Sequence, residues 1–163
     1  MKKLLISAGA VCALALSTPA FAVTSNSASA TATVNIVSPL QLTNTAGLNF
    51  GTVVGPFSGT VVRVSNTGTR TCGSLTCSGT PSAAAFTVKG TASQGLTVKV
   101  DTSVTMTSGS NNLSVDLTTD LPTAVATDAT GAASFGVGGS LTIPASTPDG
   151  LYSGTFNVQV NYQ

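Results

Sequence analysis

The chain contains no histidine, tryptophan or glutamate, and charged residues make up only 7% of its 163 positions. Without histidine, neither a Ser-His-Asp nor a Cys-His catalytic arrangement can form, and an imidazole metal site is excluded. The six basic residues are scattered along the chain, so they form no patch for a nucleic-acid backbone. We therefore expect neither an enzyme nor a nucleic-acid-binding protein, and no cofactor.

The composition that remains favours strands. Threonine is the commonest residue and there are 17 glycines, whereas lysine and arginine together number only six. Such a chain is poor in helix formers and rich in residues that suit a pleated sheet. Its mean hydropathy of +0.39 and small net charge are not those of a disordered protein. The length fits one domain.

The first 22 residues have the pattern of a secretory signal peptide. Two lysines follow the initial methionine, an apolar stretch covers 4–16, and a small-x-small cleavage site lies at 20–22. The apolar stretch is shorter than the roughly 20 residues of a membrane span, and no later stretch qualifies. We expect a mature chain of 23–163, without a membrane span, exported to the periplasm and then to the cell surface or beyond.

Two cysteines remain after such a cleavage. Cys12 lies in the apolar stretch and would be removed with it. Cys72 and Cys77 then remain as the two cysteines of an exported chain, for which a structural disulfide is the expected state. A redox-active pair is less favoured because the spacing is not Cys-x-x-Cys. A metal site is less favoured because two sulfurs leave the coordination shell incomplete.

Short stretches of apolar-polar alternation recur through 23–163, with turn residues between them. They predict eight or nine strands and no helix, hence a β-sandwich or barrel. Loops are expected over 66–84, around the cysteines, and over 121–131. The Gly-Val-Gly-Gly sequence at 136–139 is interpreted as a tight turn between two short strands. Charged side chains take the polar positions of strands, as a one-sided sheet requires; they are Arg63, Lys89, Lys99 and Asp116.

The N-terminal arm, residues 23–37, starts with small polar residues and then alternates apolar with polar residues. One face of 28–36 carries only apolar side chains, namely Ala28, Ala30, Ala32, Val34 and Ile36. Such a segment can pair as a strand with another copy of the protein, as a donor strand. It can equally be the first strand of its own domain.

The last strand has the clearest alternation. Phe156, Val158, Val160 and Tyr162 face one way, with polar residues between them. An edge strand with no cover is an aggregation hazard, which a protein can manage by pairing that edge with a second chain. The other interpretation is an edge already paired within the domain.

Four sequence blocks together resemble a bacterial family of unknown function, family 4402, in order from about Ala30 to Tyr162. They are LNFGTVV at 48–54, AFTVKG at 85–90, GSLT at 139–142 and GLYSGTFNV at 150–158. This family is similar in pattern to spore coat protein U domains and to chaperone–usher pilins. Tyr162 is a penultimate aromatic residue and Gly150 stands fourteenth from the end, as on the strand that a periplasmic chaperone grips in many pilins.

The resemblance implies an all-β, immunoglobulin-like antiparallel β-sandwich that is incomplete and polymerises by donor-strand exchange. We hypothesise an exported structural subunit of a bacterial surface fibre (pilus- or fimbria-like) or coat. Its partners would be other copies or related subunits, with a periplasmic chaperone as a further partner. The alternative is a self-complete secreted β-sandwich module for binding or adhesion. In the first hypothesis the arm fills pockets along the C-terminal edge strand, at Gly150, Phe156, Val158, Val160 and Tyr162.

Overall fold

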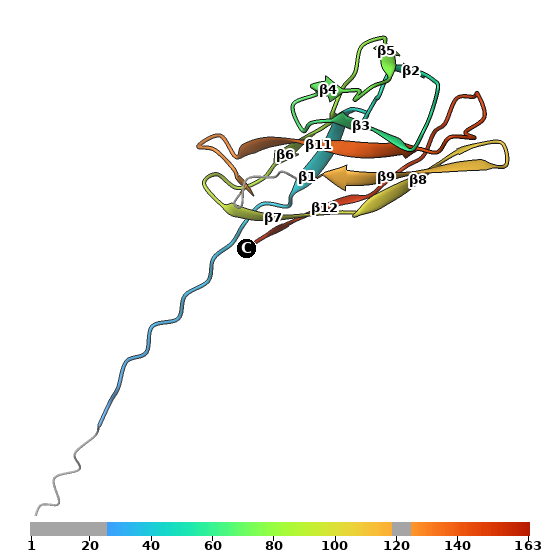
Figure 1. Ribbon diagram of the computed structural model, residues 1–163. Coiled ribbons are helices and arrows are strands. Elements are labelled where there is room, and N and C mark those ends of the chain that lie inside the picture. Colours follow the sequence, from blue (N-terminus) through green and yellow to red (C-terminus); the bar gives the residue numbers. More distant parts are fainter. Residues whose placement is uncertain (1–25, 119–124) are drawn as a thin grey trace, which may run out of the picture. The chain divides into compact units, whose positions relative to one another are not determined.

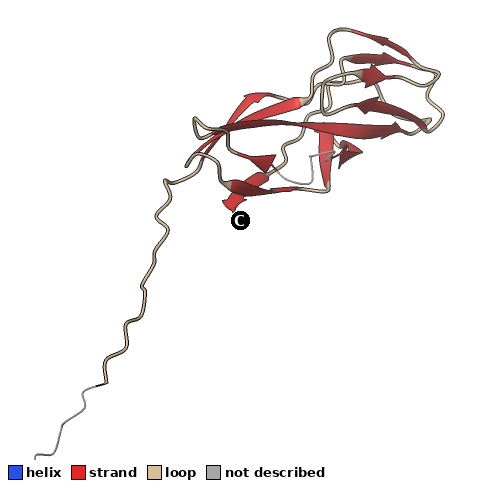
Figure 2. Cartoon of the chain, turned by 90° about the vertical axis from the view of Figure 1, so that its left-hand side faces the viewer, coloured by secondary structure: helices blue, strands red, loops and turns tan. Residues whose placement is uncertain are grey.

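The structure is a computed structural model that describes residues 26–118 and 125–163. Within these ranges it contains strands and loops but no helix, which confirms the all-β prediction (Figure 2). The chain divides into two units, Met1–Val34 and Asn35–Gln163. The predicted signal peptide, 1–22, lies outside the described residues. No helix long and apolar enough to cross a membrane was found in the described part of the chain.

Twelve strands make up the second unit in the described ranges (Figure 1). In chain order they are β1 Gln41–Ala46, β2 Thr52–Val54, β3 Thr60–Val64, β4 Arg70–Thr71, β5 Thr76–Ser78, β6 Ala84–Lys89, β7 Gly95–Val100, β8 Ser103–Ser108, β9 Asn111–Thr118, β10 Val125–Ala126, β11 Ala132–Ile143 and β12 Val158–Tyr162. All their pairings are antiparallel, and the sheets curl into a sandwich-like fold.

The long strand β11 organises the first layer. Its first half pairs with β6, which in turn pairs with β1. Its second half lies between β3 on one edge and β9 on the other, so that Leu141 faces both Val62 and Val115. The prediction of two short strands joined by a glycine turn at 136–139 was therefore wrong. These glycines lie inside one strand. The backbone at 64–66 passes too close to Gly136 and Gly138 for a side chain, and the side chains of Val115 and Leu48 crowd Gly139.

The second layer is built on β7 and β8, which follow each other with only two residues between them. β7 pairs with β12 on one edge and β10 on the other, while β8 pairs with β9. Because β9 also pairs with β11, it joins the second layer to the first along one side of the sandwich. A continuous series of paired strands thus runs from β1 through β6, β11 and β9 to β8.

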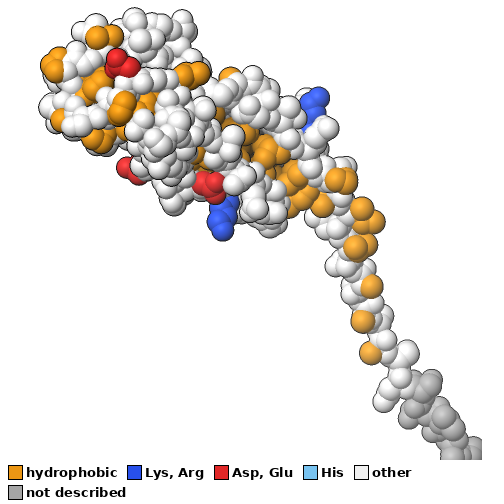
Figure 3. All heavy atoms as spheres, turned by 90° about the vertical axis from the view of Figure 1, so that its right-hand side faces the viewer, with side chains coloured by type: hydrophobic (Ala, Val, Ile, Leu, Met, Phe, Trp, Pro, Cys, Tyr) orange, Lys and Arg blue, Asp and Glu red, His pale blue; other side chains and the backbone are white. Residues whose placement is uncertain are grey.

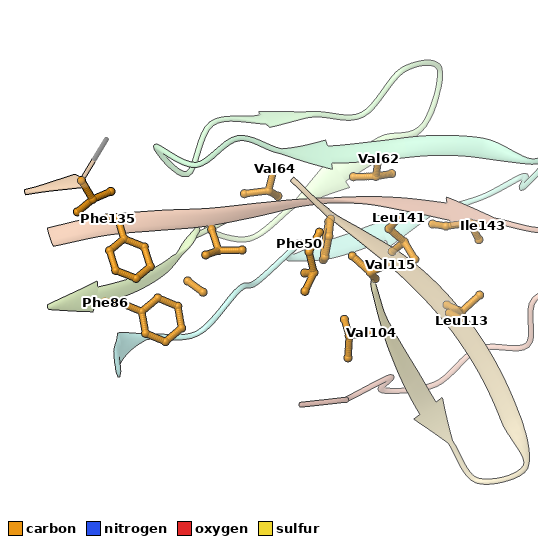
Figure 4. Close-up of a cluster of buried hydrophobic side chains, with 14 of the residues drawn as sticks. Phe50, Val62, Val64, Phe86, Val104, Leu113, Val115, Phe135, Leu141 and Ile143 are labelled. Carbon is orange, nitrogen blue, oxygen red and sulfur yellow. The ribbon is translucent and has the colours of Figure 1, made fainter. Parts of the chain in front are cut away.

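The hydrophobic core lies between these layers. Figure 4 shows Val104, Leu113 and Val115 of the β8–β9 hairpin pointing toward Phe50 and the second half of β11. Phe86 and Phe135 stack at the other end, with ring centroids 5.5 Å apart. The charged strand residues predicted to face solvent are exposed, which confirms a one-sided sheet; they are Arg63, Lys89, Lys99 and Asp116.

Two segments predicted as loops contain short strands. β4 and β5 lie within 66–84, and β10 lies within 121–131. Each has only two or three residues, too few for periodicity to identify. β2 and β5 pair as a separate two-stranded sheet that carries the disulfide.

Candidate functional site

Among the edge strands of the sandwich are β1 and β12, the first and last strands, which each have a strand partner on one side only. β1 pairs with β6, and β12 pairs with β7; neither has a second strand partner among residues 26–118 and 125–163. The residues before β12 lie along the neighbouring strand β8, because Ser153 forms an isolated antiparallel β-bridge with Thr107 of β8. We call residues 153–163 the C-terminal segment. It presents an unpaired edge that runs beside β8 and then β7.

The inward side chains of these edges are less covered than those of the interior strands. Val62, Val88 and Val115 each have an exposed fraction of 0%. In contrast, the inward residues of the C-terminal segment are only partly buried; they are Phe156, Val158, Val160 and Tyr162. Leu42 of β1 and Met106 of β8 are also only partly buried. The predicted alternation of the last strand is confirmed, and its apolar face is incompletely covered.

Two cavities are lined by residues from 44–53 and from 147–156, and neither is lined by a residue of β12. One has a volume of about 380 Å³ and is lined by 154–156 of the C-terminal segment, by Leu48 beyond the end of β1, and by Phe86 and Met106. The second, of about 370 Å³, also contacts Leu48 and Met106 and continues to 147–152. Because these cavities share wall residues, we treat them as one apolar groove, the edge groove.

The Tyr162 side chain fastens the end of β12 to the residues before β1 and after β6. Its hydroxyl donates a hydrogen bond to the carbonyl oxygen of Ser38 (2.7 Å) and accepts one from the backbone N–H of Thr91 (2.7 Å). The N–H of Ser38 in turn donates to the Thr91 hydroxyl oxygen (2.7 Å). A side chain at Gly90 would collide with the Tyr162 hydroxyl, so glycine is needed here. Tyr162 was predicted as an edge residue, but its partners Ser38 and Thr91 have no signature in the sequence.

The regular strand begins later than the C-terminal prediction supposed. Gly150 and Phe156 lie outside β12, which begins at Val158. The regular pairing is interrupted where β7 ends, since the Asp101 carboxylate accepts hydrogen bonds from the backbone N–H and side-chain amide of Asn157 (2.8 and 3.1 Å). Gly150 lines the edge groove, and the Phe156 ring lies edge-on to the Phe86 ring, with ring centroids 6.4 Å apart.

The described part of the N-terminal arm is exposed and forms no strand. All residues from 26 to 36 are exposed, including the apolar face Ala28, Ala30, Ala32, Val34 and Ile36. The exposed fractions of Val34 and Ile36 are 82% and 83%. Residues 26–36 form no strand with any other described segment, so the interpretation of the arm as the first strand of its own domain gains no support, and its role as a donor strand stays a prediction.

Comparison with protein families identifies one match. Residues 40–162 match the family described as Domain of unknown function (DUF4402). The chain belongs to this family. The match runs from just before β1 to the end of β12, and it confirms the resemblance of the four sequence blocks to this family. Searches among curated proteins and among solved structures found no match.

The DUF4402 domain carries few charged side chains. Figure 3 shows isolated charged side chains on a face of mostly uncharged polar atoms, with hydrophobic side chains reaching the surface between them.

Hydrogen bonds from the Thr130 side chain and from the backbone N–H groups of Ala132 and Thr130 lower the pKa of Asp128. This carboxylate holds the turn before β11. No cluster of three potential metal ligands was found among the described residues.

The disulfide predicted between Cys72 and Cys77 is present in the DUF4402 domain. Cys77 lies on β5, opposite Val53 of β2, and Val53 lines the edge groove. The Arg70 side chain holds the same region by donating hydrogen bonds to the carbonyl oxygens of Phe50 (2.7 Å) and Ser78 (2.9 Å). The disulfide thus stabilises the part of the fold that forms one wall of the groove.

Replacing both cysteines with serine should destabilise the domain by roughly 2 kcal/mol, the loop-closure entropy of so short a loop. Amide hydrogen exchange should rise first in β2 and β5, because those strands have few other pairings. Urea denaturation and hydrogen exchange measure the two effects. Equal acceleration in β11 would contradict a local role for the disulfide.

Proposed function

We propose that this protein is an exported structural subunit that assembles by donor-strand pairing, in which the arm of one copy fills the edge groove of the next. Two observations support the proposal: a mostly apolar groove lined by residues from 44–53 and from 147–156, and the edges of β1 and β12, which each lack a second strand partner in the described ranges. A strand laid there would pair with the unpaired backbone on both sides and cover the partly buried side chains.

The arm has the properties that such an occupant needs. Its alternation places five apolar side chains on one face, and strand geometry gives 28–36 a length of about 26 Å. That length is similar to that of the C-terminal segment, which has nearly the same number of residues. Covering Val34 and Ile36 would contribute roughly 1.5–3 kcal/mol each, and the alanines less.

The product of such pairing is a fibre or coat at the bacterial surface. Each copy offers one arm and one groove, and because these are different surfaces, the contact is heterologous and can continue without limit. Related subunits could supply the arm in place of identical ones. A periplasmic chaperone would hold the groove of a newly exported copy until an arm replaces it.

Deletion of residues 23–36 tests the proposal. The shortened protein should be monomeric, whereas a control deletion of the polar residues 23–27 should still assemble. Adding a synthetic peptide of residues 26–37 to the shortened protein should raise its thermal unfolding midpoint, because the peptide supplies the missing strand. Size-exclusion chromatography and differential scanning calorimetry provide the measurements. Normal assembly without 23–36, or an intact protein that stays monomeric, would refute donor-strand pairing and favour a self-complete binding module.

A further inference from the structure

We propose that a polar pocket on the outer face of the first layer binds an acidic sugar through its carboxylate and hydroxyl groups. This outer pocket is lined by residues of β3, β4, β9 and β11 and by the connection between β3 and β4, and its volume is about 230 Å³. It shares no described lining residue with the edge groove. The inference therefore goes beyond the proposed function and does not depend on assembly.

The outer pocket lies where four strands follow one another across the first layer, in the order β4, β3, β11 and β9 (Figure 1). Their register puts four residues in one row across the sheet: Thr71, Arg63, Ser140 and Asp116. The residues next to Arg63 and Ser140 along their strands are buried in the core. Because side chains alternate along a strand, those of Arg63 and Ser140 lie on the outer face.

The connection between β3 and β4 makes one wall of the outer pocket. Gly136 and Gly138 are outward-facing positions of β11, and a side chain on either would collide with backbone atoms of residues 64–66. The connection therefore crosses the outer face of β11 beside the pocket. Its turn is fixed by the Ser65 hydroxyl oxygen, which accepts a hydrogen bond from the backbone N–H of Thr69 (3.0 Å). The pocket is thus formed by a chain crossing that only glycine permits.

Arg63 supplies the positive charge of the outer pocket. Its side chain is exposed, and no hydrogen bond or ion pair joins it to another residue of the ranges 26–118 and 125–163. The guanidinium of Arg70 differs, because it is bonded to two backbone carbonyl oxygens. A planar guanidinium can hold a carboxylate with two parallel hydrogen bonds. Arg63 therefore suits a ligand that carries a carboxylate.

Hydroxyl groups make up most of the remaining polar lining of the outer pocket. They belong to Ser65, Thr69, Thr71, Thr118 and Ser140. A hydroxyl both donates and accepts hydrogen bonds, so it matches the hydroxyl groups of a sugar, which do the same. The described lining residues include no aromatic side chain, so recognition would depend on hydrogen bonds and not on stacking.

Asp116 limits the charge of the ligand. It lies just outside the outer pocket and follows Ser140 in the row, so its Cα atom is roughly 10 Å from that of Arg63, at about 4.8 Å for each strand spacing. Its carboxylate would repel a phosphate dianion more than the singly charged carboxylate of a sugar. The same carboxylate can accept a hydrogen bond from a sugar hydroxyl on the side away from Arg63.

The size of the outer pocket limits the ligand further. Its volume of about 230 Å³ is below the roughly 300–1,000 Å³ of most small-molecule pockets. One sugar unit suits this space better than a longer saccharide. Uronic acids and sialic acids both carry a carboxylate beside hydroxyl groups, and the experiment distinguishes these two sources.

Saturation-transfer difference NMR on the full-length exported protein tests the proposal, because the method detects weak ligands of single molecules and of fibres alike. The probes are D-glucuronate and N-acetylneuraminate, with glucose, acetate and inorganic phosphate for comparison. At least one acidic sugar should give a saturable signal, whereas the three comparison compounds should bind much more weakly. Whichever acidic sugar binds identifies the source of the carboxylate.

Variants of the single cation locate the binding. Arg63→Gln should lower the apparent affinity for the acidic sugar about ten-fold, since it removes a charge-assisted pair of hydrogen bonds. Arg63→Lys should restore only part of it, because an ammonium cannot bind a carboxylate through two parallel bonds. Lys99→Gln is the matched control. It removes the same charge from an exposed position of β7, in the second layer, and should bind like the unaltered protein.

Three results would overturn the proposal. A folded protein that binds neither acidic sugar has no such site, with circular dichroism as the check on folding. Acetate or phosphate that binds as well as the acidic sugar would indicate a simple anion site. Equal loss of affinity in Arg63→Gln and Lys99→Gln, or no loss in Arg63→Gln, would place the binding elsewhere. None of these readouts depends on fibre assembly, so the proposed function is tested separately.

Discussion

Replacing Val34 and Ile36 together with aspartate should leave the protein folded but monomeric. Both side chains are more than four-fifths exposed, so the substitutions remove no contact that the domain's own core needs. In an assembled fibre the same positions would lie in an apolar groove. The lost burial of the two side chains alone amounts to about 3–6 kcal/mol, which lowers the association constant by two to four orders of magnitude.

A matched control carries the same charge on the other face of the arm. Thr31→Asp with Thr33→Asp adds two carboxylates at positions that would stay in solvent, so this variant should assemble almost as well as the unaltered protein. Analytical ultracentrifugation measures the assembly, and circular dichroism checks that both variants are folded. Equal loss of assembly in the two variants would indicate that net charge, and not the apolar face, decides the association.

Gly138→Ala should destabilise the domain more than any single change considered for the groove. The added methyl would collide with the carbonyl oxygen of Val64 and lie 2.7 Å from the carbonyl carbon of Ser65. Both are backbone atoms, which cannot rotate away, and Gly138 itself is buried in β11. Overpacking of this kind costs about 3 kcal/mol.

Gly47→Ala is the control for this substitution. Gly47 directly follows β1, at the edge of the first layer. A Cβ atom added to this glycine would have no other atom within 4 Å. Its free energy of unfolding should change by less than about 0.5 kcal/mol. Chemical denaturation followed by circular dichroism compares the two variants. Similar stabilities would contradict the close backbone approach that explains the glycines of β11.

The strand content of this protein could be predicted from its sequence because alternation is a local property. The last strand is an example, since Phe156, Val158, Val160 and Tyr162 do share one partly buried face. The course of β11 could not be predicted in the same way. Its glycines, read locally, indicate a turn, and only the approach of residues 64–66, far away in the sequence, explains a continuous strand.

The edge groove was predictable only in part. The sequence indicated an arm and an open edge, but the opposite wall at Leu48 and Phe50 and the floor at Met106 depend on which strands neighbour each other. The hydrogen bonds that fasten the end of β12 join Ser38, Thr91 and Tyr162, which lie more than 50 positions apart from one another in the sequence. Hydrogen bonds of this range leave no periodic pattern.

The placement of β1 has a mechanical consequence for a fibre of the proposed kind. The arm leads almost directly into β1, which is joined to β6 by an antiparallel ladder from Gln41 opposite Lys89 to Ala46 opposite Ala85. A pull transmitted along the arm would act lengthwise on this ladder and would load all its hydrogen bonds at once. Such a shear geometry resists force better than one in which the bonds open one after another, so tension would pass through each subunit without peeling it apart.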